Sequence, residues 1–115
     1  MIELNGVKLQ LDINKKDFIL KKMFNLQTGI TRLQGSFQGE ELALKTIYAI
    51  LEFFNLLYGN GTDKKITGGK TDLISCLGLL NSYMEQIVKE YQVSEKEREK
   101  LSKYNKNRLV REWTF

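Results

Sequence analysis

The sequence predicts an α+β fold, in which an N-terminal β-hairpin precedes a mainly α-helical bundle of three to four helices. Two observations support this prediction. Apolar residues alternate with polar ones on either side of Asn5-Gly6, and from Asp17 onward apolar residues recur at intervals of three and four. At 115 residues the chain has room for one folded domain. We divide it into a hairpin and helical domain, residues 1–93, and a basic C-terminal helix or tail, residues 94–115.

The hairpin is predicted from the stretch "MIELNGVKLQLDI" at the start of the chain. An Asn-Gly pair between two alternating apolar segments indicates a two-residue turn, because both turn positions need a positive φ. An isolated hairpin of this size is only marginally stable in water. We therefore expect its apolar face to pack either on the helices or on the strands of a second subunit.

Three segments have the apolar spacing of helices. The first runs from Asp17 to about Gly35, and the second begins at residues 38–41 and runs to Tyr58. The third follows Asp72, and its apolar residues are Leu73, Cys76, Leu77, Leu80, Met84, Ile87 and Tyr91. The second segment is apolar on more than one side, which predicts a central helix or one at an interface. The stretch "SEKE", residues 94–97, has the pattern of a capping box and predicts the start of a short fourth helix.

The stretch "GGKTD", residues 68–72, partly matches a phosphate-binding loop. That loop needs a glycine five residues before Gly69, where this chain has Lys64. We interpret the segment as structural and expect no nucleotide or other cofactor. Its glycines allow tight turns, and either Thr71 or Asp72 can cap the next helix. The residues of this predicted structural motif are Gly59, Gly61, Gly68, Gly69, Thr71 and Asp72.

Composition restricts the chemistry that the chain can perform. It contains no histidine and one cysteine, Cys76, so it has no Ser-His or Cys-His nucleophile and no Cys/His zinc site. Cys76 lies on an apolar stripe, which favours buried packing. The N-terminus has no signal-peptide pattern, and no apolar run reaches the roughly 18 residues of a membrane span. We therefore expect an intracellular protein with no catalytic residues and no metal site, which does not associate with membranes.

The net charge of +4 is concentrated near the C-terminus. Residues 94–115 hold seven basic and four acidic side chains, which accounts for +3 of it. A nucleic-acid-binding accessory protein that uses this tail is therefore an alternative, although four glutamates interrupt the basic residues and weaken attraction to phosphates. The aromatic residues Trp113 and Phe115 have two interpretations. They either belong to a solvated, fraying segment or are anchors for a partner.

The middle of the chain resembles a known group of proteins. The stretch from Leu51 to Ile87 is similar to small proteins from the tail modules of long-tailed phages of Gram-positive bacteria, in which an apolar helix ends in F/Y-G-x-G-T and is followed by a basic loop, G-G-K and a helix containing cysteine. The corresponding residues here are Phe54, Tyr58, Gly59, Gly61, Thr62, Lys65, Gly68, Gly69, Lys70, Asp72 and Cys76. The N-terminal hairpin is similar too, whereas the segment after Tyr91 matches nothing in the pattern.

The resemblance implies a function in virion assembly. Proteins of this group are tail assembly chaperones, which are not enzymes and which coat the tape-measure protein while the phage tail tube forms. It implies the tape-measure protein and other tail proteins as partners, and the cytoplasm of the bacterial host as the location. We also expect a homo-oligomer, because the apolar hairpin face and the wide apolar surface of the second helix exceed what one small domain needs.

Four residues of the second helix are candidates for the partner-binding surface: Tyr48, Phe53, Phe54 and Leu57. The alternative for all four is ordinary core packing, because aromatic residues at helical spacing are usually buried. Mutation separates the two interpretations. A core residue changed to alanine destabilises the fold, whereas an interface residue changed to alanine weakens binding with little effect on melting.

Overall fold

The computed structural model describes residues 1–96 and contains a two-stranded hairpin followed by helices. The predicted α+β class, with an N-terminal hairpin and a helical bundle, is confirmed. The elements in chain order are β1 (Ile2–Leu4), β2 (Val7–Leu9), the 3₁₀ turn η1 (Ile13–Lys15), α1 (Lys16–Ser36), α2 (Gly39–Tyr58), α3 (Thr62–Thr67) and α4 (Leu73–Glu90). The predicted capping box begins at the edge of the described residues, and the rest of the C-terminal segment lies outside them.

The hairpin forms around the predicted turn. β1 and β2 pair antiparallel, with Ile2 opposite Leu9 and Leu4 opposite Val7. Asn5 and Gly6 have φ values of 49° and 79°, the left-handed conformation that a tight two-residue turn requires. The side chains of Ile2, Leu4 and Leu9 are buried. We expected this apolar face to pack either on the helices or on a second subunit. It packs on the helices of the same chain, because β1 contacts α4.

Polar contacts fix the hairpin on the helices. The side-chain amide of Gln86 in α4 accepts a hydrogen bond from the backbone N–H of Glu3 and donates one to its carbonyl, both at 2.8 Å. This pair of bonds satisfies the β1 backbone in the way that a neighbouring strand would. At the turn, Nδ2 of Asn5 donates to the carbonyl of Ile66 at 2.6 Å. The hairpin is thereby held against both α3 and α4.

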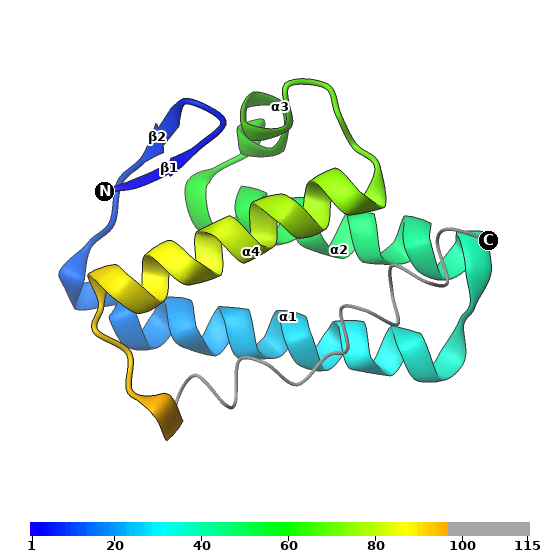
Figure 1. The fold of residues 1–115 in the computed structure, drawn as a ribbon, viewed down its shortest axis with the longest axis horizontal. Helices are drawn as coiled ribbons and strands as arrows, with labels where there is room; N and C mark the ends of the chain where they lie inside the picture. Colours follow the sequence, from blue (N-terminus) through cyan, green and yellow to red (C-terminus); the bar gives the residue numbers. More distant parts are fainter. Residues whose placement is uncertain (97–115) are drawn as a thin grey trace.

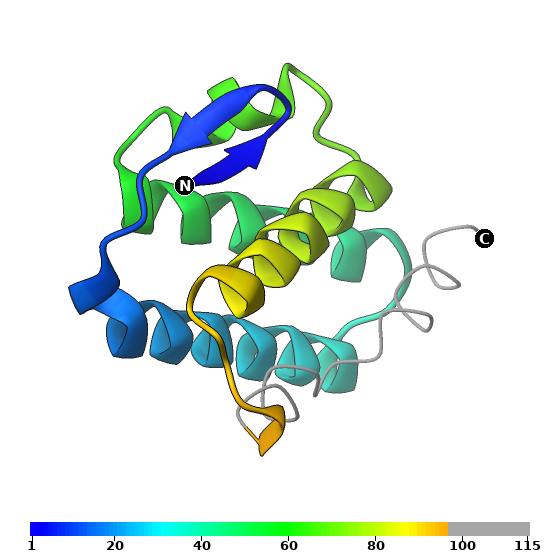
Figure 2. The ribbon, with the colours of Figure 1, turned by 60° about the vertical axis from the view of Figure 1, so that its left-hand side comes forward.

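The helices form two layers. α1 and α2 are neighbours joined by a two-residue connection, and they run side by side in opposite directions (Figure 1). α4 packs across one face of this pair, as the turned view also shows (Figure 2). Because the helices form only two layers, the protein is thin. Its shortest extent is 18 Å, against 40 and 33 Å in the other two directions. The opposite face of the α1–α2 pair carries no further helix from residues 1–96.

An aromatic cluster forms the centre of the core between α2 and α4. The Phe54 and Tyr83 rings meet edge to face at 5.2 Å between centroids, and Phe53 contacts both. Edge-to-face contacts of this kind stabilise aromatic pairs beyond the burial of their area. The hydroxyls of Tyr58 and Tyr83 lie 2.8 Å apart, so these polar atoms satisfy each other within the apolar surroundings.

The segment between the glycines corrects one expectation. The resemblance implied a basic loop there, but residues Thr62–Thr67 form the short helix α3. Gly61 and Gly68 flank this helix, and both have left-handed backbone conformations. The side chain of Ile66, within the helix, is fully buried. The side chain of Asn55 in α2 accepts the backbone N–H of Asp63 at 2.9 Å. One buried isoleucine and one capping contact therefore support a helix that is too short to produce a periodic pattern in the sequence.

Candidate partner-binding groove

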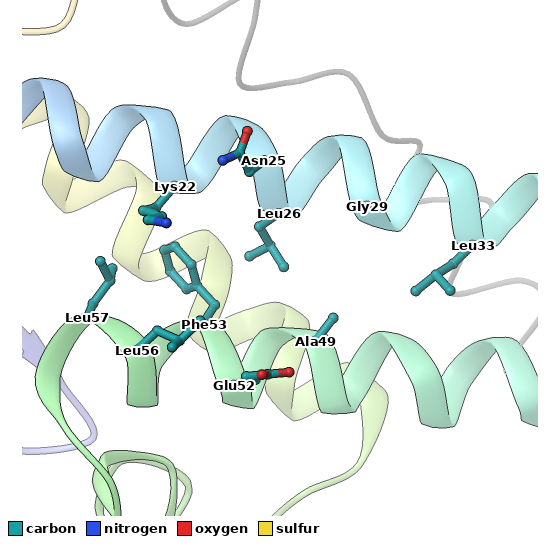
Figure 3. Close-up of a pocket in the computed structure, with 10 residues that line it drawn as sticks. All are labelled: Lys22, Asn25, Leu26, Gly29, Leu33, Ala49, Glu52, Phe53, Leu56 and Leu57. Carbon is teal, nitrogen blue, oxygen red and sulfur yellow. The ribbon is translucent and has the colours of Figure 1, made fainter.

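A mainly apolar groove lies between α1 and α2. Figure 3 views it with α4 behind, so the groove opens on the face of the α1–α2 pair that α4 does not cover. Its volume is about 410 Å³. α1 supplies one wall and α2 the other. The lining residues are Lys22, Asn25, Leu26, Gly29 and Leu33 from α1, and Ala49, Glu52, Phe53, Leu56 and Leu57 from α2.

Small residues keep the groove open. Gly29 on α1 and Ala49 on α2 line the same stretch of it, and neither has a side chain large enough to fill the space between the helices. A Cβ atom added at Gly29 would meet no atom within 4 Å. A glycine within a helix is less favourable than alanine by about 0.5–1 kcal/mol, so Gly29 reduces the stability of α1 without relieving any close contact. The space above Gly29 is therefore free to accept a side chain from another molecule.

The apolar floor has polar groups along its sides. Lys22 and Asn25 lie on the α1 wall and Glu52 on the α2 wall (Figure 3). The ammonium of Lys22 lies 5.4 Å from the centroid of the Phe18 ring, a cation–π distance. A lysine and a glutamate on opposite walls present charges of opposite sign to anything that occupies the groove. This arrangement, an apolar floor with a few polar groups beside it, is typical of a binding site for a peptide or a helix.

The four candidate residues of α2 separate into two groups. Tyr48 is 69% exposed, whereas Phe53 is 5% exposed and Phe54 is completely buried. Of the two interpretations left open for Phe54, its burial fits core packing, because the ring faces Tyr83 of α4. Phe53 and Leu57 line the groove, Phe53 at its floor and Leu57 half-buried at one end. The two C-terminal candidates, Trp113 and Phe115, lie outside the described residues.

A family comparison covers nearly the whole chain. The pattern of the DUF6673 family, described as a family of unknown function, matches residues 5–113. The chain belongs to the DUF6673 family. No curated protein and no solved structure matches this DUF6673 protein. Within residues 1–96, none of the helices has the length and apolar character needed to span a membrane.

The predicted site residues of this DUF6673 protein did not include the most exposed leucine of the groove. Leu56, on the α2 wall, is 71% exposed. Leu26 and Leu33 on the α1 wall are half-buried and also line the groove. A signal for Leu56 was present in the sequence. Leu44, Tyr48 and Leu56 follow one another at multiples of four residues, which places them on one side of α2.

The glycine motif of the DUF6673 protein has a structural role. All four of its glycines have positive φ, including Gly68 at 59° and Gly69 at 89°. Of the two candidates for capping α4, the structure shows Asp72, whose Oδ2 accepts the backbone N–H of Ser75 at 3.0 Å, while Thr71 is exposed. Hydrogen bonds from the Ser75 hydroxyl and backbone N–H lower the pKa of the Asp72 carboxyl. An anionic carboxylate thus occupies the helix start that a phosphate would need.

The titratable groups of the core are held in their neutral forms. Burial and, to a smaller extent, the nearby Asp72 carboxylate raise the pKa of the Cys76 thiol to about 11. Burial also raises the pKa of the Tyr83 hydroxyl far above its usual value of 10. A thiol with a raised pKa is a poor nucleophile at neutral pH, because the thiolate is the reactive form. Cys76 therefore acts as a small apolar residue in the packing between α4 and its neighbours.

Proposed function

We propose that this protein is a non-enzymatic binding protein that holds an apolar helical segment of another protein in the groove between α1 and α2, and that it self-associates. The observation that carries the proposal is the groove itself, which is apolar, held open by Gly29 and Ala49, and located on the face that α4 does not cover. From the resemblance to tail-module proteins of phages, the function is that of a tail assembly chaperone. Its partners are then the tape-measure protein and other tail proteins, in the cytoplasm of the bacterial host.

A helix is the partner that suits this groove best. Two neighbouring helices leave between them a straight depression, into which one apolar stripe of a third helix packs by ridges and grooves. Leu56 is the most exposed apolar side chain on the two walls of the groove. Covering one leucine side chain completely contributes about 1.5–3 kcal/mol, so Leu56 and the half-buried leucines of α1 are the main apolar contribution of this protein to binding. A long helical protein such as a tape-measure protein offers many apolar stripes of this kind.

The test uses two glycine variants in the same helix. In Gly29→Leu, the new side chain enters the groove from α1, at a position where an added Cβ atom meets no atom within 4 Å. In the matched control, Gly35→Leu, the same change is made at an exposed position of α1 that does not line the groove. Each variant is co-expressed with the tape-measure protein of the same phage genome. We expect the native protein and Gly35→Leu to keep that protein soluble and to co-purify with it, and Gly29→Leu to lose it.

Two results would contradict this proposal. Equal recovery of the tape-measure protein with Gly29→Leu and Gly35→Leu would show that the groove is not the binding site. Recovery of nucleic acid in place of protein, released steeply as salt increases, would favour the alternative of a nucleic-acid-binding protein, because counterion release makes phosphate contacts strongly dependent on salt. Contacts through the groove are mainly apolar, so we expect recovery of the tape-measure protein to depend only weakly on salt between 0.1 and 0.5 M, roughly.

A further inference from the structure

A second exposed apolar surface lies on α2, beside the groove. Leu44, Tyr48, Glu52 and Leu56 are spaced four residues apart and form one ridge along the helix. Leu44 is 56% exposed, and Tyr48 and Leu56 are more exposed than that. The groove lies on the α1 side of this ridge. A second hollow lies on the other side. The residues that line it come from α2, from the α2–α3 connection and from the start of α3: Tyr48, Leu51, Glu52, Asn55, Leu56, Asn60 and Asp63.

We propose that a second copy of the chain covers this ridge, with the two α2 helices antiparallel about a two-fold axis that passes between Tyr48 and Glu52. The spacing of the ridge is symmetric about that point. In the antiparallel pair, Leu44 of each copy therefore lies opposite Leu56 of the other, and Tyr48 of each lies opposite Glu52 of the other. An interface of this kind is isologous, because the same four residues serve both sides.

The chemistry of the four residues matches this arrangement. The Tyr48 hydroxyl is a donor, and the Glu52 carboxylate is an acceptor that needs a partner once water is removed. Within residues 1–96 no basic side chain forms an ion pair with Glu52. The antiparallel pair supplies a hydrogen bond to this carboxylate at two symmetry-related places and buries one leucine pair at each end. A parallel pair would place Glu52 against Glu52 and bring two carboxylates together, which is unfavourable. The ridge thus selects the antiparallel arrangement.

The geometry of α2 permits this contact. Helices in left-handed coiled coils and four-helix bundles cross at about 20°, an angle small enough for side chains to meet over about three turns. The hollow on the α3 side gives the partner ridge space beside Tyr48 and Leu56. The hairpin, by contrast, has no apolar face left for a second subunit, because Ile2, Leu4 and Leu9 are buried within the chain. Of the two apolar surfaces that first suggested self-association, only the one on α2 is available.

The inference rests on the self-association in the proposed function and specifies its surface, but it can fail independently of the groove. Glu52 and Leu56 border both the groove and the hollow on the α3 side, and the two surfaces differ elsewhere. Tyr48 and Leu44 do not line the groove, and Gly29 does not belong to the ridge. A change at Tyr48 therefore tests the dimer, and a change at Gly29 tests the groove.

The first experiment measures mass by light scattering and sedimentation from micromolar to millimolar concentration. We expect the native protein to dimerise. In Tyr48→Glu the new carboxylate opposes Glu52 of the other copy, so we expect the dimer dissociation constant to increase at least tenfold. The control is Ile74→Glu, which places the same charge at a half-exposed apolar position of α4. It should leave the dimer unchanged. A monomer at every concentration, or equal dimerisation of Tyr48→Glu and the native protein, would overturn the inference.

The second experiment tests the register by disulfide formation. Tyr48→Cys and Glu52→Cys are made separately, and the native Cys76 does not compete because it is buried. An equimolar mixture of the two variants should form a mixed disulfide dimer under mild oxidation much faster than either variant alone forms its own. Equal rates for the mixture and for the separate variants would exclude the antiparallel register. If Tyr48→Glu is a monomer and still co-purifies with the tape-measure protein, the groove proposal remains intact. If Gly29→Leu still dimerises but no longer co-purifies with the tape-measure protein, the two surfaces are separate.

Discussion

Removing the Phe54 ring should destabilise the protein far more than removing an exposed ring of the same type. Phe54 is completely buried and meets Phe53 and Tyr83 edge to face, both at 5.2 Å. Burial of a phenylalanine side chain contributes about 1.5–3 kcal/mol, and each edge-to-face pair adds about 0.5–1.5 kcal/mol. Phe54→Ala should therefore lower the free energy of unfolding by about 3–5 kcal/mol, the range observed for such truncations in cores. Phe18 is half exposed, so Phe18→Ala should cost about 1 kcal/mol.

Urea unfolding followed by far-UV circular dichroism measures both changes. Domains of this size have total stabilities of roughly 6–17 kcal/mol, so Phe54→Ala removes a large fraction of it. We expect its melting temperature to decrease by at least about 10 °C. If Phe54→Ala and Phe18→Ala had equal effects on stability, Phe54 would not lie in the core. The assignment of α2 faces to α4, to the groove and to the exposed ridge would then be wrong.

Four further predictions concern single side chains. Gly69→Val should destabilise the fold, because the φ of 89° at this position is closed to a β-branched residue, whereas Lys70→Ala, one residue on, should leave melting unchanged in a thermal scan. Asp72→Ala should cost about 1 kcal/mol at neutral pH by removing the α4 cap. Folding lowers the pKa of Asp72 below 3.8, so this stabilisation is present above pH 3.8 and is lost as the pH falls through the pKa of the folded state. The free energies of unfolding of the native protein and Asp72→Ala, measured in urea, should therefore converge in acid. Cys76 should react with a thiol reagent only as fast as the protein unfolds, and rapid reaction in native buffer would contradict its burial. Thr46 has a buried hydroxyl without a hydrogen-bond partner, so Thr46→Val should increase stability by up to about 1 kcal/mol, and a loss on calorimetric melting would refute this.

The local signals in the sequence predicted much of the fold. The Asn5-Gly6 pair determines the hairpin turn and its register, because few other residues accept positive φ at both positions. The spacing of apolar residues located α1 and α2 to within a few residues of their ends. Asp72 was one of two predicted caps for α4. Each of these features depends on neighbours within a few positions along the chain, which a sequence displays directly.

The orientation of α2 could not be predicted in the same way. This helix is apolar on several sides, so its periodicity does not show which side faces α4, which faces α1 and which faces solvent. Phe54 and Leu56 are two positions apart and equally apolar, yet one is completely buried and the other is 71% exposed. The difference arises from how α1 and α4 pack around α2, which depends on long-range contacts. α3 was missed for a related reason, since Ile66 is its only large apolar residue.

The central claim is that the groove between α1 and α2 binds an apolar helix, and nuclear magnetic resonance tests it most directly. The measurement is a titration of the isotope-labelled protein with synthetic helical segments of the proposed partner, a tape-measure protein, followed through backbone amide and methyl signals. We predict saturable shifts at Leu26, Leu33, Ala49 and Leu56, which line the groove, and their absence in Gly29→Leu. Shifts confined to the glycine motif or to the hairpin, with the groove signals unchanged at saturation, would contradict the claim.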